Sequence, residues 1–134
     1  MYLLDTNICI YGMKNRYPSL RKKLLTISPS EIYVSAVTIA ELEYGAAKSK
    51  WGERTRDWMY VFLGSFTILP FEGSDAGCYG RIREYLESRG TPIGPYDMMI
   101  AAQGVSRKYT VVTHNTKEFS RIPGIMLEDW VEQL

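Results

Sequence analysis

The chain has 134 residues, of which 46% are apolar and 23% are charged, and its formal net charge at pH 7 is +1. This composition excludes disordered and fibrous chains and is typical of a globular domain with its own core. No apolar run approaches the ~20 residues that a membrane-spanning helix needs, and no secretory leader precedes Tyr2. Two cysteines, Cys9 and Cys78, are too few for a disulfide framework or a structural zinc site. We therefore expect reduced thiols in a cytoplasmic protein.

Short apolar or β-branched runs alternate with helical patterns along the whole chain. Strands are predicted at residues 2–4, 32–35, 67–70, 109–113 and 125–127. Helices are predicted at residues 8–13, 18–27, 37–47, 53–63 and 74–89, and from residue 95 onward. Ser74 or Asp75 is expected to cap the helix that Gly90 ends, and Pro95 is expected at the first position of the next one. Strands that alternate with helices predict a parallel sheet covered on both faces, so we interpret residues 1–134 as a single α/β domain.

The basic residues are unevenly distributed. Residues 14–23 contain five of them and no acid, and Lys22 and Lys23 stand side by side in this cluster. Such a cluster can contact the phosphates of a nucleic acid, or it can be the solvated face of a helix. We retain Lys22 and Lys23 as candidate substrate-binding residues.

Three acids occupy similar structural contexts. Asp5 directly follows the first strand, Glu41 lies about one turn inside the helix after the second, and Asp97 falls in the first turn after Pro95. Carboxylates about 5 Å apart repel by roughly 3 kcal/mol per pair at an effective dielectric constant near 20. A hard divalent cation such as Mg²⁺ removes this penalty and can also bind a scissile phosphate. We therefore predict a metal-dependent phosphodiesterase site, with structural alternatives: a helix cap at Asp5, a solvated Glu41 and a first-turn charge at Asp97.

Four blocks of the sequence, in this order, resemble the PIN-domain ribonucleases. They are Leu4-Asp5-Thr6-Asn7, the block from Ala40 to Gly45, the block from Gly90 to Asp97, and the block from Val112 to Phe119. The ending from Ile122 to Trp130 matches as well, so the resemblance covers nearly the whole chain. More narrowly, the blocks resemble the VapC toxins of bacterial type II toxin–antitoxin systems.

The resemblance implies a three-layer α/β/α fold with a five-stranded parallel sheet. It also implies dependence on Mg²⁺ or Mn²⁺, and endonucleolytic RNA cleavage that leaves a 3′-hydroxyl and a 5′-phosphate. By position, Asp5, Glu41 and Asp97 would be the catalytic, metal-binding acids. Thr6 and Thr113 would orient carboxylates or water by hydrogen bonding.

The chain departs from the family pattern at Asn115, where many PIN domains have a fourth acid. Asparagine offers a carbonyl oxygen but no charge, so we expect one tightly held ion, with a second recruited by substrate. Glu118 could contribute the missing charge, although it could equally be a surface residue. His114, the only histidine, could transfer a proton, but metal-dependent hydrolysis does not require an imidazole.

The resemblance also implies a cognate VapB-like antitoxin that pushes a basic side chain toward the acidic pocket. The expected assembly is a homodimer or a toxin–antitoxin hetero-oligomer. The antitoxin is expected to contact the helical pair over residues 37–63. The expected substrate is structured RNA, for instance tRNA, cut in a single-stranded loop, because proteins read unpaired bases most easily. Two alternatives stay open: a PIN nuclease for RNA maturation or for DNA that has no antitoxin, and an inactive RNA-binding module.

Overall fold

The computed structural model describes residues 1–131, so the last three residues of the predicted domain lie outside the described part. The strands are β1 (Tyr2–Leu4), β2 (Ile32–Ser35), β3 (Thr67–Leu69), β4 (Thr110–Val112) and β5 (Met126–Glu128). The helices are α1 (Thr6–Met13), α2 (Pro18–Thr26), α3 (Ala36–Lys48), α4 (Gly52–Leu63), α5 (Gly73–Ser88), α6 (Pro95–Arg107) and α7 (Thr116–Phe119), with a 3-10 turn η1 (Pro29–Glu31). None of these helices is both long and apolar enough to cross a membrane.

The strands form one parallel sheet in the order β3-β2-β1-β4-β5. The central strand β1 pairs Leu3 with Tyr33 of β2 and with Val111 of β4. Because the strands are parallel, their carboxyl ends lie along the same rim of the sheet, where ligands bind in open α/β folds. The predicted α/β class with a five-stranded parallel sheet is confirmed.

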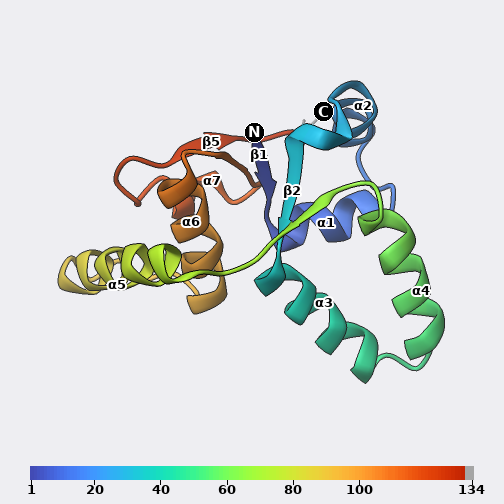
Figure 1. Ribbon diagram of the computed structural model, residues 1–134, viewed down its shortest axis with the longest axis horizontal. Helices are drawn as coiled ribbons and strands as arrows, with labels where there is room; N and C mark the ends of the chain where they lie inside the picture. Colours follow the sequence, from blue (N-terminus) through green and yellow to red (C-terminus); the bar gives the residue numbers. More distant parts are fainter. Residues whose placement is uncertain (132–134) are drawn as a thin grey trace.

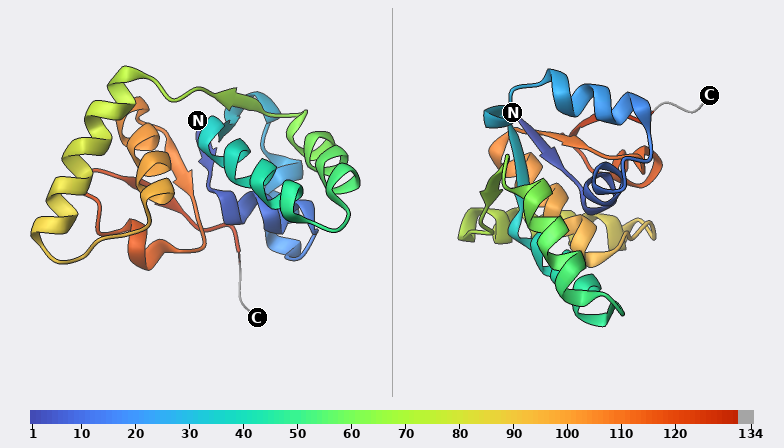
Figure 2. Two further views of the ribbon diagram at one scale, coloured as in Figure 1. Left: turned by 90° about the horizontal axis from the view of Figure 1, so that it is seen from below. Right: turned by 90° about the vertical axis from the view of Figure 1, so that its right-hand side faces the viewer.

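Successive side chains of β1 enter two different cores. Leu3 and Leu4 are both completely buried. Leu3 packs in a cluster with Leu86 of α5, whereas Leu4 packs with Ile8 of α1 and Leu20 of α2. Figures 1 and 2 show α5 and α6 on one side of the molecule and α1 to α4 on the other. The sheet is therefore covered on both faces, which explains why its strands are apolar runs rather than alternating ones.

Two helix starts position candidate acids. α1 begins directly after Asp5, two residues earlier than predicted, because a side-chain oxygen of Asp5 accepts a hydrogen bond from the Ile8 amide at 2.8 Å. α6 begins with Pro95, as predicted, and this places Asp97 in its first turn. The local sequence therefore determines where both acids enter the fold.

The start of α5 differs from the prediction. Glu72 is its N-cap, and the Glu72 amide donates a hydrogen bond to Asp75 at 2.9 Å. The predicted N-cap position, Ser74 or Asp75, was wrong because the helix begins at Gly73; Asp75 lies at the third helical position, where it closes a capping box with Glu72 and also pairs with Arg107 of α6 at 3.1 Å. Gly90 follows the helix with a φ of 68°, the left-handed conformation that favours glycine after a helix end.

Two short elements were not predicted. Residues 28–31 lie between the predicted helix and the predicted strand, and Pro29–Glu31 forms one 3-10 turn before β2. The one-turn helix α7 follows β4 and is too short to show a helical period in the sequence. α7 matters for the site because it carries Glu118.

The helices α3 and α4 form an antiparallel pair that extends away from the sheet (Figure 1). Arg56 of α4 forms an ion pair with Glu43 of α3 at 2.8 Å, and the Tyr60 hydroxyl donates to the same carboxylate at 2.8 Å. Glu43 therefore joins the two helices, whereas Glu41, two residues earlier, faces the candidate site.

Candidate active site

Asp5 lies at the junction between the central strand and α1 and is only 3% exposed. One of its oxygens accepts the hydrogen bond from the Ile8 amide, so Asp5 does cap α1. The hydroxyl of Thr113, the residue after β4, also hydrogen-bonds its carboxylate. The helix-cap alternative for Asp5 is therefore correct. Capping α1 also leaves the Asp5 carboxylate at the sheet rim, where a catalytic acid is expected.

Glu41 enters the site from the second turn of α3. Thr6, the first residue of α1, donates a hydrogen bond to a Glu41 carboxylate oxygen at 2.7 Å and lies 3.0 Å from the Thr38 hydroxyl. These contacts join α1 to α3 beside Asp5. Glu41 is therefore held by a buried hydroxyl and is not a freely solvated helix residue.

The electrostatics show that the three acids share one environment. Burial raises the pKa of Asp5 to about 6, hydrogen bonds from Thr113 and Ile8 oppose that rise, and the charges of Asp97 and Glu41 add to it. Burial also raises the pKa of Asp97, with further contributions from Glu41 and Glu118. The fold therefore brings residues 5, 41 and 97 close enough to repel one another, together with a fourth acid at 118.

The fourth acid comes from α7. The Asn115 amide N–H donates to the Thr113 hydroxyl at 2.9 Å, and the Asn115 side-chain amide donates to Glu118 at 2.7 Å. Asn115 therefore orients a carboxylate in place of supplying one. Glu118 is visible in the sequence, but the helix α7 that brings it to the site is too short to show a helical pattern of apolar residues.

The donor set fits a hard divalent cation, although it is not a finished chelate. Among residues 1–131, no three acidic, histidine or cysteine side chains converge closely enough to form a ready-made metal site. In the same range, no ion pair joins a lysine or arginine to Asp5, Glu41 or Asp97. One buried and two half-buried carboxylates that repel one another and have no cationic partner favour an oxygen-binding cation that draws them together.

His114 also lies beside the site, next to Asn115. Its Nδ1 is 2.9 Å from a carboxylate oxygen of Asp129, and its ring centroid is 6.3 Å from that of Tyr17. The sequence analysis missed Asp129 as a partner because it follows β5, fifteen positions later in the chain. The partner fixes the orientation of the imidazole at the rim of the sheet.

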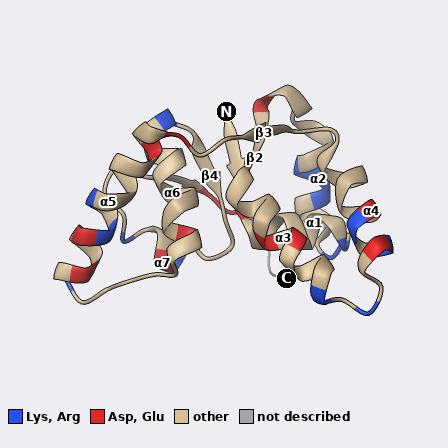
Figure 3. Cartoon of the chain, turned by 60° about the horizontal axis from the view of Figure 1, so that its bottom comes forward, with Lys and Arg blue, Asp and Glu red and all other residues tan. Residues whose placement is uncertain are grey.

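The candidate substrate-binding lysines lie on α2, where Figure 3 shows basic segments in blue. Lys22 and Lys23 are exposed and line a hollow with Asp129 and Trp130. The Lys23 ammonium is 5.9 Å from the centroid of the Trp130 ring. Because Asp129 also contacts His114, these lysines continue the surface that begins at the acids.

Comparisons with known proteins agree with this geometry. The PIN domain family matches residues 2–125. The chain is 42% identical to the tRNA(fMet)-specific endonuclease VapC of Salmonella typhimurium over 129 residues, which are 96% of this chain and 97% of the relative. It is 38% identical to ribonuclease VapC2 of Rickettsia felis over 131 residues, 97% of this chain and 98% of that one. The crystal structure of DNA-bound VapBC from Salmonella typhimurium superposes with a TM-score of 0.91 at 41% identity, covering 96% of this chain and 97% of that chain.

Both the identities and the shared fold extend over nearly the full length of the chain, as the four sequence blocks predicted. The chain belongs to the PIN-domain family and, within it, to the VapC ribonuclease toxins of toxin–antitoxin systems.

Proposed function

We propose that this protein is a Mg²⁺-dependent endoribonuclease that cuts tRNA in a single-stranded loop and is silenced by a VapB-like antitoxin in the cytoplasm. The observation that carries the proposal is the set of mutually repelling acids, the buried Asp5 with the half-buried Glu41 and Asp97, at the carboxyl end of the central strand. The relatives that are tRNA(fMet)-specific endonucleases support tRNA as the substrate class. Mn²⁺ is expected to substitute for Mg²⁺.

The residues of the site have different roles in the proposed hydrolysis. Asp5, Glu41 and Asp97 would hold the cation, which supplies Lewis-acid activation of the scissile phosphate and of the attacking water. Thr6 fixes the carboxylate of Glu41, and Thr113 fixes that of Asp5.

At the other side of the site, the side-chain amide of Asn115 fixes Glu118. Glu118 is then available to a second cation that arrives with substrate, as the asparagine at position 115 suggested. These hydrogen bonds hold the acids in place before substrate binds, which is the preorganisation that electrostatic catalysis requires.

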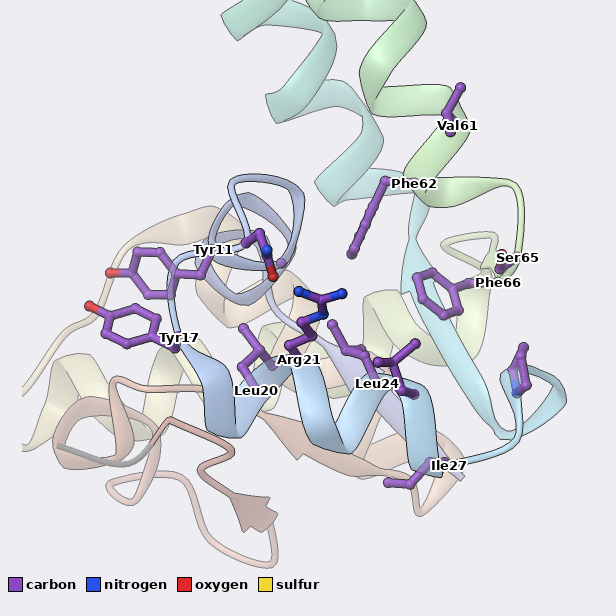
Figure 4. A pocket seen from close by; sticks show the side chains of 14 residues that line it. Tyr11, Tyr17, Leu20, Arg21, Leu24, Ile27, Val61, Phe62, Ser65 and Phe66 are labelled. Carbon is purple, nitrogen blue, oxygen red and sulfur yellow. The ribbon is translucent and has the colours of Figure 1, made fainter. Parts of the chain in front are cut away.

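A groove beside α4 supports the antitoxin proposal. A hollow of about 520 Å³ lies between α1, α2 and α4, and Figure 4 shows Phe62 of α4 and Leu24 of α2 pointing into it. Leu25 and Val61 at its edge are 76% and 78% exposed. An amphipathic helix would cover these apolar side chains, with an acidic residue for the neighbouring Arg21. The groove includes Val61 and Phe62 of the helical pair over residues 37–63, the expected antitoxin contact, and extends from there to α1 and α2.

The catalytic proposal is tested with purified protein and total RNA in Mg²⁺, in Mn²⁺ and in chelator, followed by mapping of RNA 5′ ends. Discrete cuts with 5′-phosphates, in a tRNA loop, are expected with either metal and not with chelator or with Asp5→Asn. If neither metal produces discrete cuts, the chain is an RNA-binding module. If DNA is cut in preference to RNA, the ribonuclease proposal is wrong.

The antitoxin groove is tested by co-expression of the protein with the antitoxin of its operon. Val61→Glu should abolish co-purification of the two proteins and leave RNA cleavage unchanged, because residue 61 is exposed and lines a hollow that none of the catalytic acids lines. Ile68→Glu, on the exposed edge strand β3, is the matched control and should co-purify normally. Normal co-purification of Val61→Glu would refute this docking surface.

A further inference from the structure

A second cavity lies directly beside the acids. It has a volume of about 390 Å³ and is enclosed by α1, α3 and α4, beside an earlier turn of α4 than the groove described above. Glu41 and Thr6 form part of its lining, and these two side chains are hydrogen-bonded to each other. The cavity is therefore continuous with the catalytic centre.

The walls of this cavity suit a flat aromatic group. Ile10 and Met59 contribute buried or half-buried apolar surface, and Tyr44 and Trp58 line it while remaining 67% and 45% exposed. Exposed aromatic rings next to an apolar hollow provide stacking faces, which nucleic-acid-binding proteins use for unpaired bases. The volume lies in the range of about 300–1,000 Å³ that is typical of small-molecule pockets, which is enough for one base with its ribose.

The polar groups of the cavity suit a polyanion. Lys14, the C-cap of α1, and Lys48 of α3 both line it, and the Lys48 ammonium is 4.9 Å from the centroid of the Tyr44 ring. The exposed Asn7 adds a side-chain amide that can donate to and accept from the edge of a base. Cations that flank an aromatic wall would contact the phosphates on either side of a stacked nucleotide.

We propose that this cavity is a specificity subsite that receives one unpaired nucleobase of the RNA substrate, next to the phosphate that is cut. The inference rests on the proposed ribonuclease function. It adds that the part of the substrate recognised is an unpaired base, and that this base binds in the cavity beside Glu41. The position of Glu41 in both the cavity and the acid cluster makes the bound base a neighbour of the scissile phosphate. A peptide of the antitoxin is the competing occupant; two lysines beside exposed aromatic rings favour RNA, which carries a phosphate on either side of a stacked base.

The test uses a synthetic RNA hairpin that contains the mapped cleavage site, and copies in which one loop nucleotide at a time is made abasic. Binding is measured by fluorescence anisotropy on Asp5→Asn protein, so that cutting does not interfere. One abasic position should weaken binding by about 5- to 150-fold, the range for base–aromatic stacking. In the Trp58→Ala background, the same abasic position should have little further effect.

Trp51→Ala is the matched control. Trp51 is likewise exposed, at 59%, but it lines a different hollow. The abasic effect should persist in full in this variant. The proposal is overturned if Trp58→Ala retains the full abasic effect. It is also overturned if Trp58→Ala binds intact RNA normally but fails to co-purify with the antitoxin, because the cavity then holds the partner. If no RNA is cut with any metal, it is the proposed function that fails; if discrete cutting persists without coupling to Trp58, only the subsite fails.

Discussion

Asp5→Asn provides a direct test of the claim that the acids of the site destabilise the folded protein when no metal is bound. Asparagine caps a helix about as well as aspartate, so the hydrogen bond from the Ile8 amide is retained. The substitution removes only the buried charge. We expect the variant to lose RNA cleavage and to be more stable than the wild type in metal-free buffer.

The magnitude follows from the pKa of Asp5. A rise from 3.8 to about 6 corresponds to about 3 kcal/mol of destabilisation by the ionised form, and no solvent discount applies because the residue is 3% exposed. The amide group that replaces one oxygen no longer accepts the hydrogen bond from Thr113, which costs about 1 kcal/mol. The net gain is about 2 kcal/mol. With an unfolding entropy of about 2.1 cal/mol/K per residue over 134 residues, Tm should rise by about 7 °C.

The free energy of unfolding depends on pH through Asp5 with the opposite sign to that of an ion-paired aspartate. Because the pKa of Asp5 is higher in the folded than in the unfolded protein, the folded protein binds the proton more tightly. The destabilisation by the ionised carboxylate is therefore absent below about pH 3.8. It grows as the pH rises toward 6 and stays constant above that value. The Tm advantage of Asp5→Asn should therefore be full at pH 7.5 and absent at pH 4.

The assay is thermal unfolding followed by circular dichroism in chelator, from pH 4 to pH 8. Asp75→Asn is the matched control, because Asp75 is equally buried but pairs with Arg107, so its neutralisation should lower Tm at pH 7.5. Adding Mg²⁺ should raise the Tm of the wild type and not that of Asp5→Asn. If Asp5→Asn is destabilised as Asp75→Asn is, the charge of Asp5 is already compensated in the apoprotein and the reasoning is wrong.

Three further predictions concern the surroundings of the acids. Gly104→Ala should lower the free energy of unfolding by about 1–3 kcal/mol, because the new methyl group would meet a β4 side chain. Gly80→Ala in α5 should raise it by about 0.5–1 kcal/mol, because a methyl group there meets no other atom. Chemical denaturation measures both changes, and equal effects would contradict the packing of α6 on the sheet. Thr6→Val removes the hydroxyl that holds Glu41 and should slow cleavage at saturating RNA; an unaltered cleavage rate would show that this hydrogen bond is not needed. Replacing Lys22 and Lys23 by glutamine should weaken RNA binding and reduce the steepness of its salt dependence by about two counterions, and an unchanged salt slope would exclude this face from the RNA contact.

The sequence by itself determined the parts of this protein that depend on local chemistry. The apolar run that ends at Asp5, the β-branched run before the helix of Glu41, and the proline that begins the helix of Asp97 all specify their elements within a few residues. Since parallel strands align their carboxyl ends, this local information was enough to predict that acids from distant segments meet at one rim. The family blocks then identified the ribonuclease class.

Only the tertiary structure decided which partner each side chain has. Asp75 closes the capping box of α5 and is also a buried ion-pair residue, because Arg107 reaches it from another helix. Glu118 lies close enough to raise the pKa of Asp97 because one turn, too short to leave a periodic pattern, brings it back to the site. The cavity beside Glu41 exists only where three helices enclose it. Hydrogen bonds, ion pairs and cavities of this kind join residues far apart in the chain, and their formation depends on packing distances that no local pattern records.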